Sequence, residues 1–313
     1  MKLIVPDYYA DFRCIAGSCR HTCCVGWEID IDPQSLQRYQ AMPGTLGERL
    51  RSHIDDMEGS PHFRLSSDER CPFLNRDGLC DLIIEAGDSI LCQICTDHPR
   101  FRNILSDREE MGLGLCCEAA ARLILTRKEP VRLVVLSDDG SKCRLSRRDK
   151  HILQKRDLWL SIAQDRSLSV SKRMDLLAES EKLIFPSCTL KEWAQLYQSL
   201  ERLDDAWTNE LALLQNEKAA APLAESFWDD ALEQLLVYFL FRHIAAAEDN
   251  DELRPRLAFC LLSVRLISYL ASLHSTSAPF GIDDLCDLAR MYSSEIEYSQ
   301  ENTDALLNAL WNV

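Results

Sequence analysis

The sequence predicts a mainly α-helical protein with a cysteine-rich, metal-binding N-terminal region that contains short strands, followed by an all-helical C-terminal part. Ten of the 14 cysteines lie within the first 117 residues. Ten of the 11 glycines lie at or before Gly140, so turns are concentrated in the first part. Further along the chain, apolar residues recur at helical spacing. An apolar fraction of 46% is enough to build a sizeable core.

The boundary between the two parts is expected near residue 150, shortly after the turn-forming run at 137–141. We therefore expect a cysteine-rich metal- or cluster-binding region over residues 1–150 and an acidic helical domain over residues 151–313. No internal repeat of fixed period is present.

Few elements are predicted in the first part. Asp32 followed by Pro33 indicates a helix N-cap with proline at the first helical position, and that helix should continue through Tyr39. Strands are expected at Trp27–Ile31 and Val131–Leu136, where β-branched and aromatic residues gather.

The second part reads as a series of helices. A capping box of the Thr-x-x-Glu type begins at Thr189, and Ser226 is placed to cap a long apolar helix. The stretch at 257–273 is the most apolar, but Arg265 in its middle and its limited length favour a buried helix over a membrane span. The helices are expected over 189–200, 226–240, 257–273, 283–292 and 303–311.

The charge distribution excludes some partners. The net charge is −15, with 21 basic against 24 acidic residues in the first 150 and 14 against 26 in the remainder. Such a chain lacks the basic face that nucleic acids require, and its acidic half would attract a basic partner or simply aid solubility. The opening MKLIVPDYYADF lacks the pattern of a signal peptide, so we expect a cytoplasmic protein with reduced thiols and no membrane partner.

The early cysteines form tight groups, which is how cytosolic chains commonly hold a metal or a cluster. Three interpretations stay open: an iron–sulfur cluster with thiolate ligands, a zinc site that could include His21 or His98, or burial of cysteines as small apolar residues. The last suits the isolated Cys143, Cys188, Cys260 and Cys286. The candidate metal ligands are Cys14, Cys19, Cys23, Cys24, Cys71, Cys80, Cys92, Cys95 and Cys116.

Four ordered segments carry a family resemblance. The segment FRCIAGSCRHTCCVGWEIDID resembles the opening signature of the flagellin lysine-N-methylase family, a cysteine-rich group that chelates iron or zinc. The later segments CPFLNRDGLCDL, LCQICTDHPRF and LGLCCEAAARLIL follow in the order of that family, and YFLFRH at 238–243 is similar to a motif of its second half. Family members carry Cys-Pro where this chain has Cys116-Cys117, which leaves the role of Cys117 open.

The resemblance implies an S-adenosylmethionine-dependent protein-lysine N-methyltransferase that acts on flagellin of the bacterial flagellum, with an iron–sulfur centre, 4Fe-4S or alternatively zinc. Composition and spacing by themselves indicate only a metal site on an acidic helical protein. The alternative functions are a non-catalytic metal-binding module that recruits a basic protein, and an iron–sulfur redox protein.

Methyl transfer to an amine needs a deprotonated lysine and a bound methyl donor. The Gly-rich loop of common donor-binding folds is absent, since only Gly112-Leu113-Gly114 hints at it. An open iron of a cluster could therefore hold the donor, or the metal could be purely structural. The candidate residues are Asp30 and Tyr238 for catalysis and Arg100 and Arg242 for cofactor binding. Tyr238 and Arg242 are four residues apart and should lie on one helix face. Cys116 and Cys117 should open a helix, whose N-terminus favours the thiolate form of a cysteine.

Overall fold

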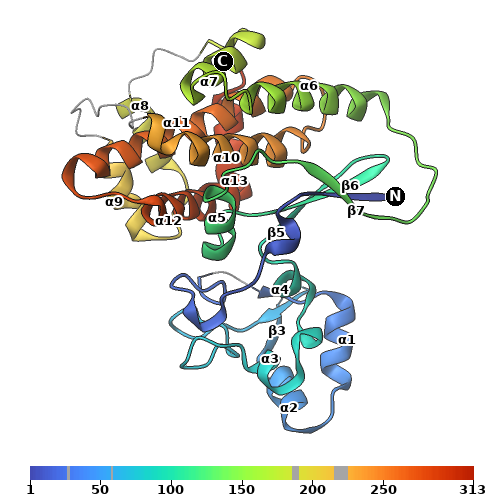
Figure 1. Cartoon of the computed structure of the whole chain (residues 1–313). Coiled ribbons are helices and arrows are strands. Elements are labelled where there is room, and N and C mark those ends of the chain that lie inside the picture. The colour runs from blue at the N-terminus through green and yellow to red at the C-terminus, as the bar shows by residue number, and fades with distance from the viewer. Residues whose placement is uncertain (27–28, 58, 185–189, 215–224) are drawn as a thin grey trace. The chain divides into compact units, whose positions relative to one another are not determined.

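A computed structural model describes residues 1–26, 29–57, 59–184, 190–214 and 225–313 (Figure 1). The chain separates into two units. Arg13–Arg100 form the smaller, cysteine-rich unit, and Met1–Phe12 together with Phe101–Val313 form the larger, helical unit. The first strand of the chain thus belongs to the helical unit, although the whole cysteine-rich unit follows it in sequence.

A four-stranded sheet with the order β5-β6-β1-β7 lies in the helical unit. Strand β1 (Lys2–Pro6) is central, because it pairs in parallel with β6 (Arg108–Leu113) and antiparallel with β7 (Leu133–Asp138). Strand β5 (Arg100–Ile104) completes the other edge. The apolar sequence of β1 suits this central position, because the side chains of Ile4, Val5 and Pro6 are buried there.

Helices make up the rest of this unit. Serine side chains cap three of them by accepting a backbone hydrogen bond: Ser146 before α6, Ser169 before α7 and Ser299 before α13. The helices are α5 (Glu118–Leu125), α6 (Arg147–Ala163), α7 (Val170–Ser180), α8 (Leu190–Ser199), α9 (Asp205–Leu213), α10 (Glu225–Ile244), α11 (Leu253–Ser277), α12 (Ile282–Tyr292) and α13 (Gln300–Ala309), with a π-helical turn η4 (Ser293–Glu297) after α12.

The core of this unit is built on α10 and α11, which run alongside each other (Figure 1). Among the described residues, Leu253–Thr276 is the one helical stretch long and apolar enough to cross a membrane by length and composition, but 72% of its most apolar window is buried inside the protein. Phe259 and Ile267 on this helix are fully buried. The expected buried helix over 257–273 is therefore confirmed, since tertiary packing covers its apolar surface.

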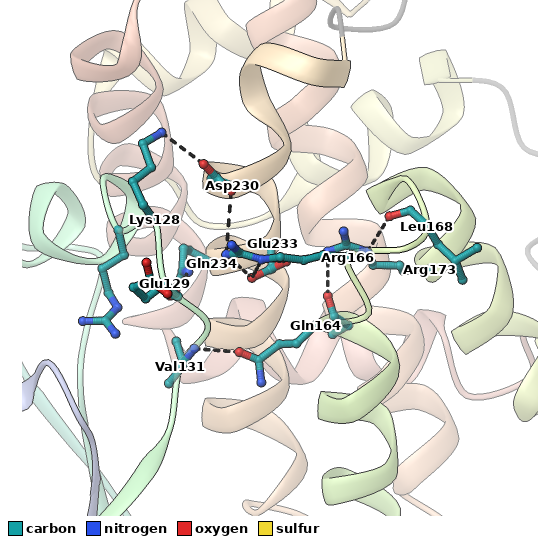
Figure 2. Close-up of polar contacts among 12 residues, drawn as sticks. Lys128, Glu129, Val131, Gln164, Arg166, Leu168, Arg173, Asp230, Glu233 and Gln234 are labelled. Carbon is teal, nitrogen blue, oxygen red and sulfur yellow. Dashed lines mark hydrogen bonds and ion pairs between the residues drawn. The ribbon is translucent and has the colours of Figure 1, made fainter.

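Buried charges fix α10 to its neighbours (Figure 2). The Glu233 carboxylate accepts hydrogen bonds from Arg166 Nη2 at 2.8 Å and from Arg173 Nη1 at 2.7 Å. Close by, the Gln234 amide donates to the Glu129 carbonyl oxygen at 2.9 Å. Since Glu233 and Arg173 are almost completely buried, the two arginines satisfy a carboxylate that could not stay charged there alone.

The cysteine-rich unit contains a three-stranded sheet with the order β2-β4-β3 and several short helices. Asp32 caps the first helix as expected, because its side chain accepts from Ser35 N at 2.9 Å, and it also accepts from Gln93 N at 2.8 Å. The elements are β2 (Ile29–Asp30), β3 (Ile54–Met57), β4 (Ser60–Phe63), α1 (Pro33–Ala41), α2 (Gly44–Ser52), α3 (Asp81–Ala86) and α4 (Gln93–Asp97), with 3-10 turns η2 (Ala16–Ser18) and η3 (Asp88–Ile90); η1 (Tyr9–Asp11) precedes this unit.

The mainly helical fold is confirmed, while the details differ from expectation. The strand expected at Val131–Leu136 is β7, shifted by two residues, and Trp27 and Glu28 of the other expected strand lie outside the described residues. The capping residue Thr189 and the isolated Cys188 also lie outside them. The structure divides the chain at residues 13 and 100 and not near 150, because residues 101–150 contribute β6, β7 and α5 to the helical unit.

Candidate functional site

Five cysteines of the smaller unit belong to one hydrophobic core. Cys71 and Cys92 are buried members of this core, and Cys24, Cys80 and Cys95 pack against it half-buried. Backbone hydrogen bonds between distant segments help to bring them together, such as Cys71 N donating to Cys24 O at 2.8 Å. Three other candidate ligands lie further out: Cys14 and Cys23 are exposed and Cys19 is half-buried.

The pKa values of these five thiols divide into two classes. A hydrogen bond from the Cys23 thiol lowers the pKa of Cys24 to about 7, and a hydrogen bond from the Cys95 thiol lowers that of Cys92 to about 7. Burial raises the pKa of Cys71 to about 12 and raises that of Cys80. The pKa of Cys95 is raised by its bond to Cys92, by burial and by the charges of Cys24 and Cys71. The pKa values of these thiols therefore depend on the hydrogen bonds and charges of neighbouring cysteines.

The donor chemistry of this cluster fits a soft metal or an iron–sulfur centre, since thiolates are the usual ligands of both. No disulfide joins the cysteines that the structure describes. Burial and nearby Arg100 lower the pKa of His98 to about 4, so its imidazole is neutral. In the described part of the chain, no three His, Cys, Asp or Glu side chains stand together as a ready ligand set. The residue types fit a metal centre, and their arrangement in this structure does not form one.

Cys116 and Cys117 belong to the helical unit. Cys117 occupies the N-cap position of α5, which confirms that the pair opens a helix. Burial raises the pKa of Cys116 to about 12, although a hydrogen bond with Tyr298 lowers it in part. The expectation that the helix N-terminus makes this thiol a thiolate is therefore wrong for Cys116, because burial outweighs the helix dipole.

Next to Cys116, α10 and η4 hold a buried polar cluster, which we define as Tyr238, Arg242, His243 and Glu297. Arg242 Nη1 donates to the Tyr238 hydroxyl at 2.8 Å, which confirms that both residues lie on one helix face. The Tyr238 hydroxyl donates to Glu297 Oε2 at 2.9 Å, and Arg242 Nε lies 3.2 Å from Glu297 Oε1. His243 Nε2 lies 2.6 Å from the same carboxylate.

The charge states of the buried polar cluster follow from these contacts. Burial favours protonation of Glu297, but Arg242 and His243 together bring its pKa below the usual value, so the carboxylate is ionised. Burial lowers the pKa of His243, which is therefore a neutral imidazole, and raises the pKa of Tyr238 well above 10. The cluster thus contains one buried ion pair, formed by Arg242 and Glu297, with two neutral hydrogen-bonding partners.

Tyr298, which is partly exposed, contacts the buried polar cluster through Arg242. The guanidinium carbon of Arg242 lies 5.0 Å from the centre of the Tyr298 ring and 4.9 Å from that of Phe101. Tyr298 is 44% exposed and shares a hydrogen bond with the Cys116 thiol. Cation–π contacts with two aromatic rings therefore add to the ion pair of Arg242.

The four candidate residues for catalysis and cofactor binding have different surroundings. Tyr238 and Arg242 meet in the buried polar cluster, where the backbone N–H of Leu115 also donates to the Tyr238 hydroxyl at 3.2 Å. Asp30 is an exposed residue of β2, and Arg100 donates to the carbonyl oxygen of Thr96 at 3.1 Å.

Sequence reasoning missed Glu297, the carboxylate at the centre of the buried polar cluster. It lies 55 residues beyond Arg242, in the segment SSEIE, which carries no motif. The one available signal was the YFLFRH run, in which a tyrosine, an arginine and a histidine sit within a buried helix and require a partner for their charge.

Comparison with known proteins gives a family match for the second part of the chain. Residues 174–312 match the family described as the FliB lysine N-methylase C-terminal domain. The resemblance to lysine N-methylases is confirmed. That range contains Tyr238, Arg242, His243 and Glu297, so the whole buried polar cluster lies inside the matched part of the chain.

Curated relatives agree with this match. The chain is 27% identical over 134 residues to lysine-N-methylases of Salmonella choleraesuis and Salmonella typhimurium, and 25% identical over 134 residues to the flagellar biosynthetic protein FliU of Salmonella muenchen. Each alignment covers 41% of this chain. It covers 33% of the length of the two methylases and 79% of FliU. No solved structure matches this chain.

Proposed function

We propose that this protein is a protein-lysine N-methyltransferase that acts on flagellin with S-adenosylmethionine as the methyl donor, in the cytoplasm. The observation that carries the proposal is the match of residues 174–312 to the lysine N-methylase C-terminal domain, with the buried polar cluster inside it. The names of the relatives, lysine-N-methylase and flagellar biosynthetic protein, supply the reaction and the flagellar substrate.

The reaction requires a neutral amine. The lysine nitrogen, once deprotonated, attacks the donor's methyl carbon; the carbon–sulfur bond breaks, its electron pair stays on sulfur, and the nitrogen gains the methyl group. An ordinary lysine holds its proton up to a pH of about 10.4. The protein must therefore bind the ammonium, lower its pKa and pass the proton to a base or to water.

We propose a positioning role for the buried polar cluster. The Tyr238 hydroxyl keeps its proton, and its contacts to Glu297, Arg242 and the Leu115 amide occupy its hydrogen-bonding positions. This favours an orienting role for Tyr238 over a role as base. Arg242, held by Glu297 and by the Tyr298 ring, fixes the end of α10 against η4. Substrate groups that bind near Tyr298 would meet a rigid surface.

We propose that the cysteine-rich unit holds an iron–sulfur cluster, or alternatively zinc, through thiols drawn from Cys24, Cys71, Cys80, Cys92 and Cys95. The support is that all five pack on one core and influence one another's pKa values. When bound, such a centre supplies folding free energy to a small unit. A structural role agrees with the size of this core better than a role in methyl transfer.

The activity is tested by incubating the purified chain with flagellin and a donor that carries a labelled methyl group. Label on lysine side chains, absent when the donor is replaced by S-adenosylhomocysteine, is the expected result. Tyr238→Phe removes only the hydroxyl and should reduce the rate of methyl transfer about ten-fold. A properly folded chain that leaves flagellin unlabelled would show that it is a binding module.

The metal centre is tested by elemental analysis of protein purified without oxygen. We expect iron or zinc, and we expect its content to fall in Cys71→Ser and Cys92→Ser. Cys143→Ser and Cys260→Ser, which change cysteines outside the cluster, should leave the content unchanged. Metal-free protein with normal hydrogen-exchange protection over residues 13–100 would contradict the proposed centre.

A further inference from the structure

A cavity of about 280 Å³ lies in the helical unit, apart from the buried polar cluster. Residues from α9, from the C-terminal end of α11 and from α12 surround it. It is open on one side, and its lining comes from Glu210, His274, Ala278, Pro279, Phe280, Asp284, Asp287, Leu288 and Met291. All nine lie within the range that matches the methylase domain.

One wall of this cavity is apolar and aromatic. The rings of His274 and Phe280 stack with their centres 5.8 Å apart and an angle of 14° between their planes. Trp228 supports Phe280 from a centre distance of 5.8 Å, so the Phe280 ring is fixed in place. Leu288 and Met291 extend the apolar surface. A wall of this kind suits a hydrocarbon chain, and the face of an aromatic ring attracts an organic cation.

The remaining lining is acidic. Glu210 Oε2 bonds with His274 Nε2 at 2.7 Å, and Asp284 Oδ2 accepts from Gly281 N at 2.7 Å. Asp287 pairs with Arg290 at 2.8 Å. One hydrogen bond uses only part of a carboxylate's four acceptor positions, so Glu210 and Asp284 keep acceptor capacity beyond these bonds. Three carboxylates around one cavity produce a negative potential that favours a cation.

We propose that this cavity binds the side chain of the substrate lysine, an inference that rests on the proposed methyltransferase function. A lysine combines a four-carbon apolar stem with an ammonium head, which matches an aromatic and aliphatic wall facing carboxylates. The methylated product keeps its positive charge, and Phe280 attracts a methylated ammonium as well. The cavity therefore accommodates the charged lysine before transfer and the charged product after it, and a lining carboxylate can take the proton that the amine loses in between.

The same lining disfavours the methyl donor as occupant. S-adenosylmethionine carries a carboxylate, which requires a cationic or hydrogen-bond-donating partner. The nine lining residues include no lysine or arginine, and three carboxylates would repel the donor's own. The donor is therefore expected to bind beside this cavity and not within it, close enough for its methyl carbon to meet the lysine nitrogen.

The binding test uses the full chain and Nα-acetyl-lysine methylamide as the probe, followed through the ¹³C-labelled methyl group of Met291. The probe should shift this signal and saturate. Norleucine and Nε-acetyl-lysine analogues, which keep the stem without the charge, should bind at least ten-fold more weakly. Equal affinity of the uncharged analogues, or a shift produced by S-adenosylmethionine and not by the lysine probe, would overturn the proposal.

Variants identify the carboxylates. Glu210→Gln and Asp284→Asn should each weaken the probe about ten-fold and raise the KM for flagellin by a similar factor. Asp283→Asn is the matched control, because Asp283 precedes Asp284 on α12 but does not line the cavity, and it should change binding less than two-fold. If a carboxylate variant fails to fold, Phe280→Leu tests the aromatic wall with the same two readouts, and unchanged binding and KM in folded variants would contradict the assignment.

The two readouts also separate this inference from the proposed function. Probe binding that depends on Glu210, in a chain that does not label flagellin, would support the lysine pocket and contradict the methyltransferase activity. Flagellin labelling with an unchanged KM in Glu210→Gln and Asp284→Asn would support the methyltransferase activity and contradict the lysine pocket.

Discussion

The hydrophobic cores of the cysteine-rich unit and the helical unit differ in size and in composition. Among the described residues, the core of the first consists of ten buried side chains, two of them cysteines. The main core of the second contains 52, built around α10 and α11. A small core supplies little stabilisation, so small units commonly rely on metals or cross-links. A large core can accommodate ionised groups, as the buried Glu297 and Glu233 show.

The difference indicates where each unit is vulnerable. In the helical unit, stability depends on charges that must remain paired, because an unpaired buried charge is strongly unfavourable. In the cysteine-rich unit, stability depends on a small core in which a few aromatic rings pack together. Four substitutions test this contrast, two in each unit.

Glu297→Ala should have the largest effect. It leaves Arg242 buried without its carboxylate and removes partners of Tyr238 and His243, so the free energy of unfolding of the helical unit should fall by about 3–5 kcal/mol. Urea unfolding followed by circular dichroism measures this loss. Glu301→Ala, an exposed site on α13, should have almost no effect. A loss below about 1 kcal/mol in Glu297→Ala would show that the cluster does not stabilise the helical unit.

Phe63→Ala should be next, with a loss of about 3 kcal/mol in the cysteine-rich unit. The Phe63 ring is 1% exposed and lies 5.1 Å from the Phe73 ring and 5.9 Å from the Tyr39 ring, measured between ring centres. Hydrogen exchange should speed up over residues 13–100 and remain slow over 101–313. Ile84→Ala, at a 60% exposed site, serves as control. Equal acceleration in both ranges would show that the two units unfold together.

Asp149→Asn tests a buried carboxylate of the helical unit that depends on hydrogen bonds. Burial disfavours its charge, but the bonds from Ser106 and Arg148, at 2.8 Å each, bring the pKa of Asp149 down to about 2. The substitution should lower the free energy of unfolding by about 1–2 kcal/mol at pH 7.

The pH dependence of this effect has a definite sign. Because the folded-state pKa lies below the ordinary value of 3.8, the stabilisation by Asp149 is complete above about pH 4 and disappears as the pH falls toward 2. The unfolding curves of Asp149→Asn and the unchanged protein should therefore converge in acid. The 66% exposed Asp157 provides the control Asp157→Asn, and a difference that stays constant down to pH 2 would exclude this explanation.

Asp32→Ala should have the smallest effect, a loss of about 1 kcal/mol from the cysteine-rich unit, because it removes the N-cap of α1 and the bond to Gln93 N. The bonds from Gln93 and Ser35 lower the pKa of Asp32 despite its partial burial, so this stabilisation too is lost as the pH falls below about 4. Thermal unfolding of residues 13–100, with Glu48→Ala as an exposed control, measures the change. An unaltered melting temperature would show that the Asp32 cap does not stabilise this unit.

Local features of the fold could be predicted from the sequence. The pair Asp32-Pro33 indicates a helix start, and the apolar stretch at 257–273 indicates a buried helix, because both signals depend on neighbouring residues. The face shared by Tyr238 and Arg242 follows from helical spacing in the same way.

Long-range partners could not be predicted. The sequence from Lys2 to Pro6 shows a short apolar run, but nothing in it indicates that its partners are β6 and β7, more than 100 residues away. Glu297 resembles any other acidic residue until the fold places it against Arg242. The unit boundary was expected too late for the same reason, since β6 and β7 join the helical unit only through their pairing with β1.

The central position of β1 has a consequence for synthesis. This strand is translated before its two neighbours in the sheet, which follow only after residues 13–100 are complete. The cysteine-rich segment is therefore synthesised while β1 still lacks both of its strand partners. Removing Met1–Pro6 would take away the strand that joins β6 to β7, and β7 would lose its pairing with the sheet.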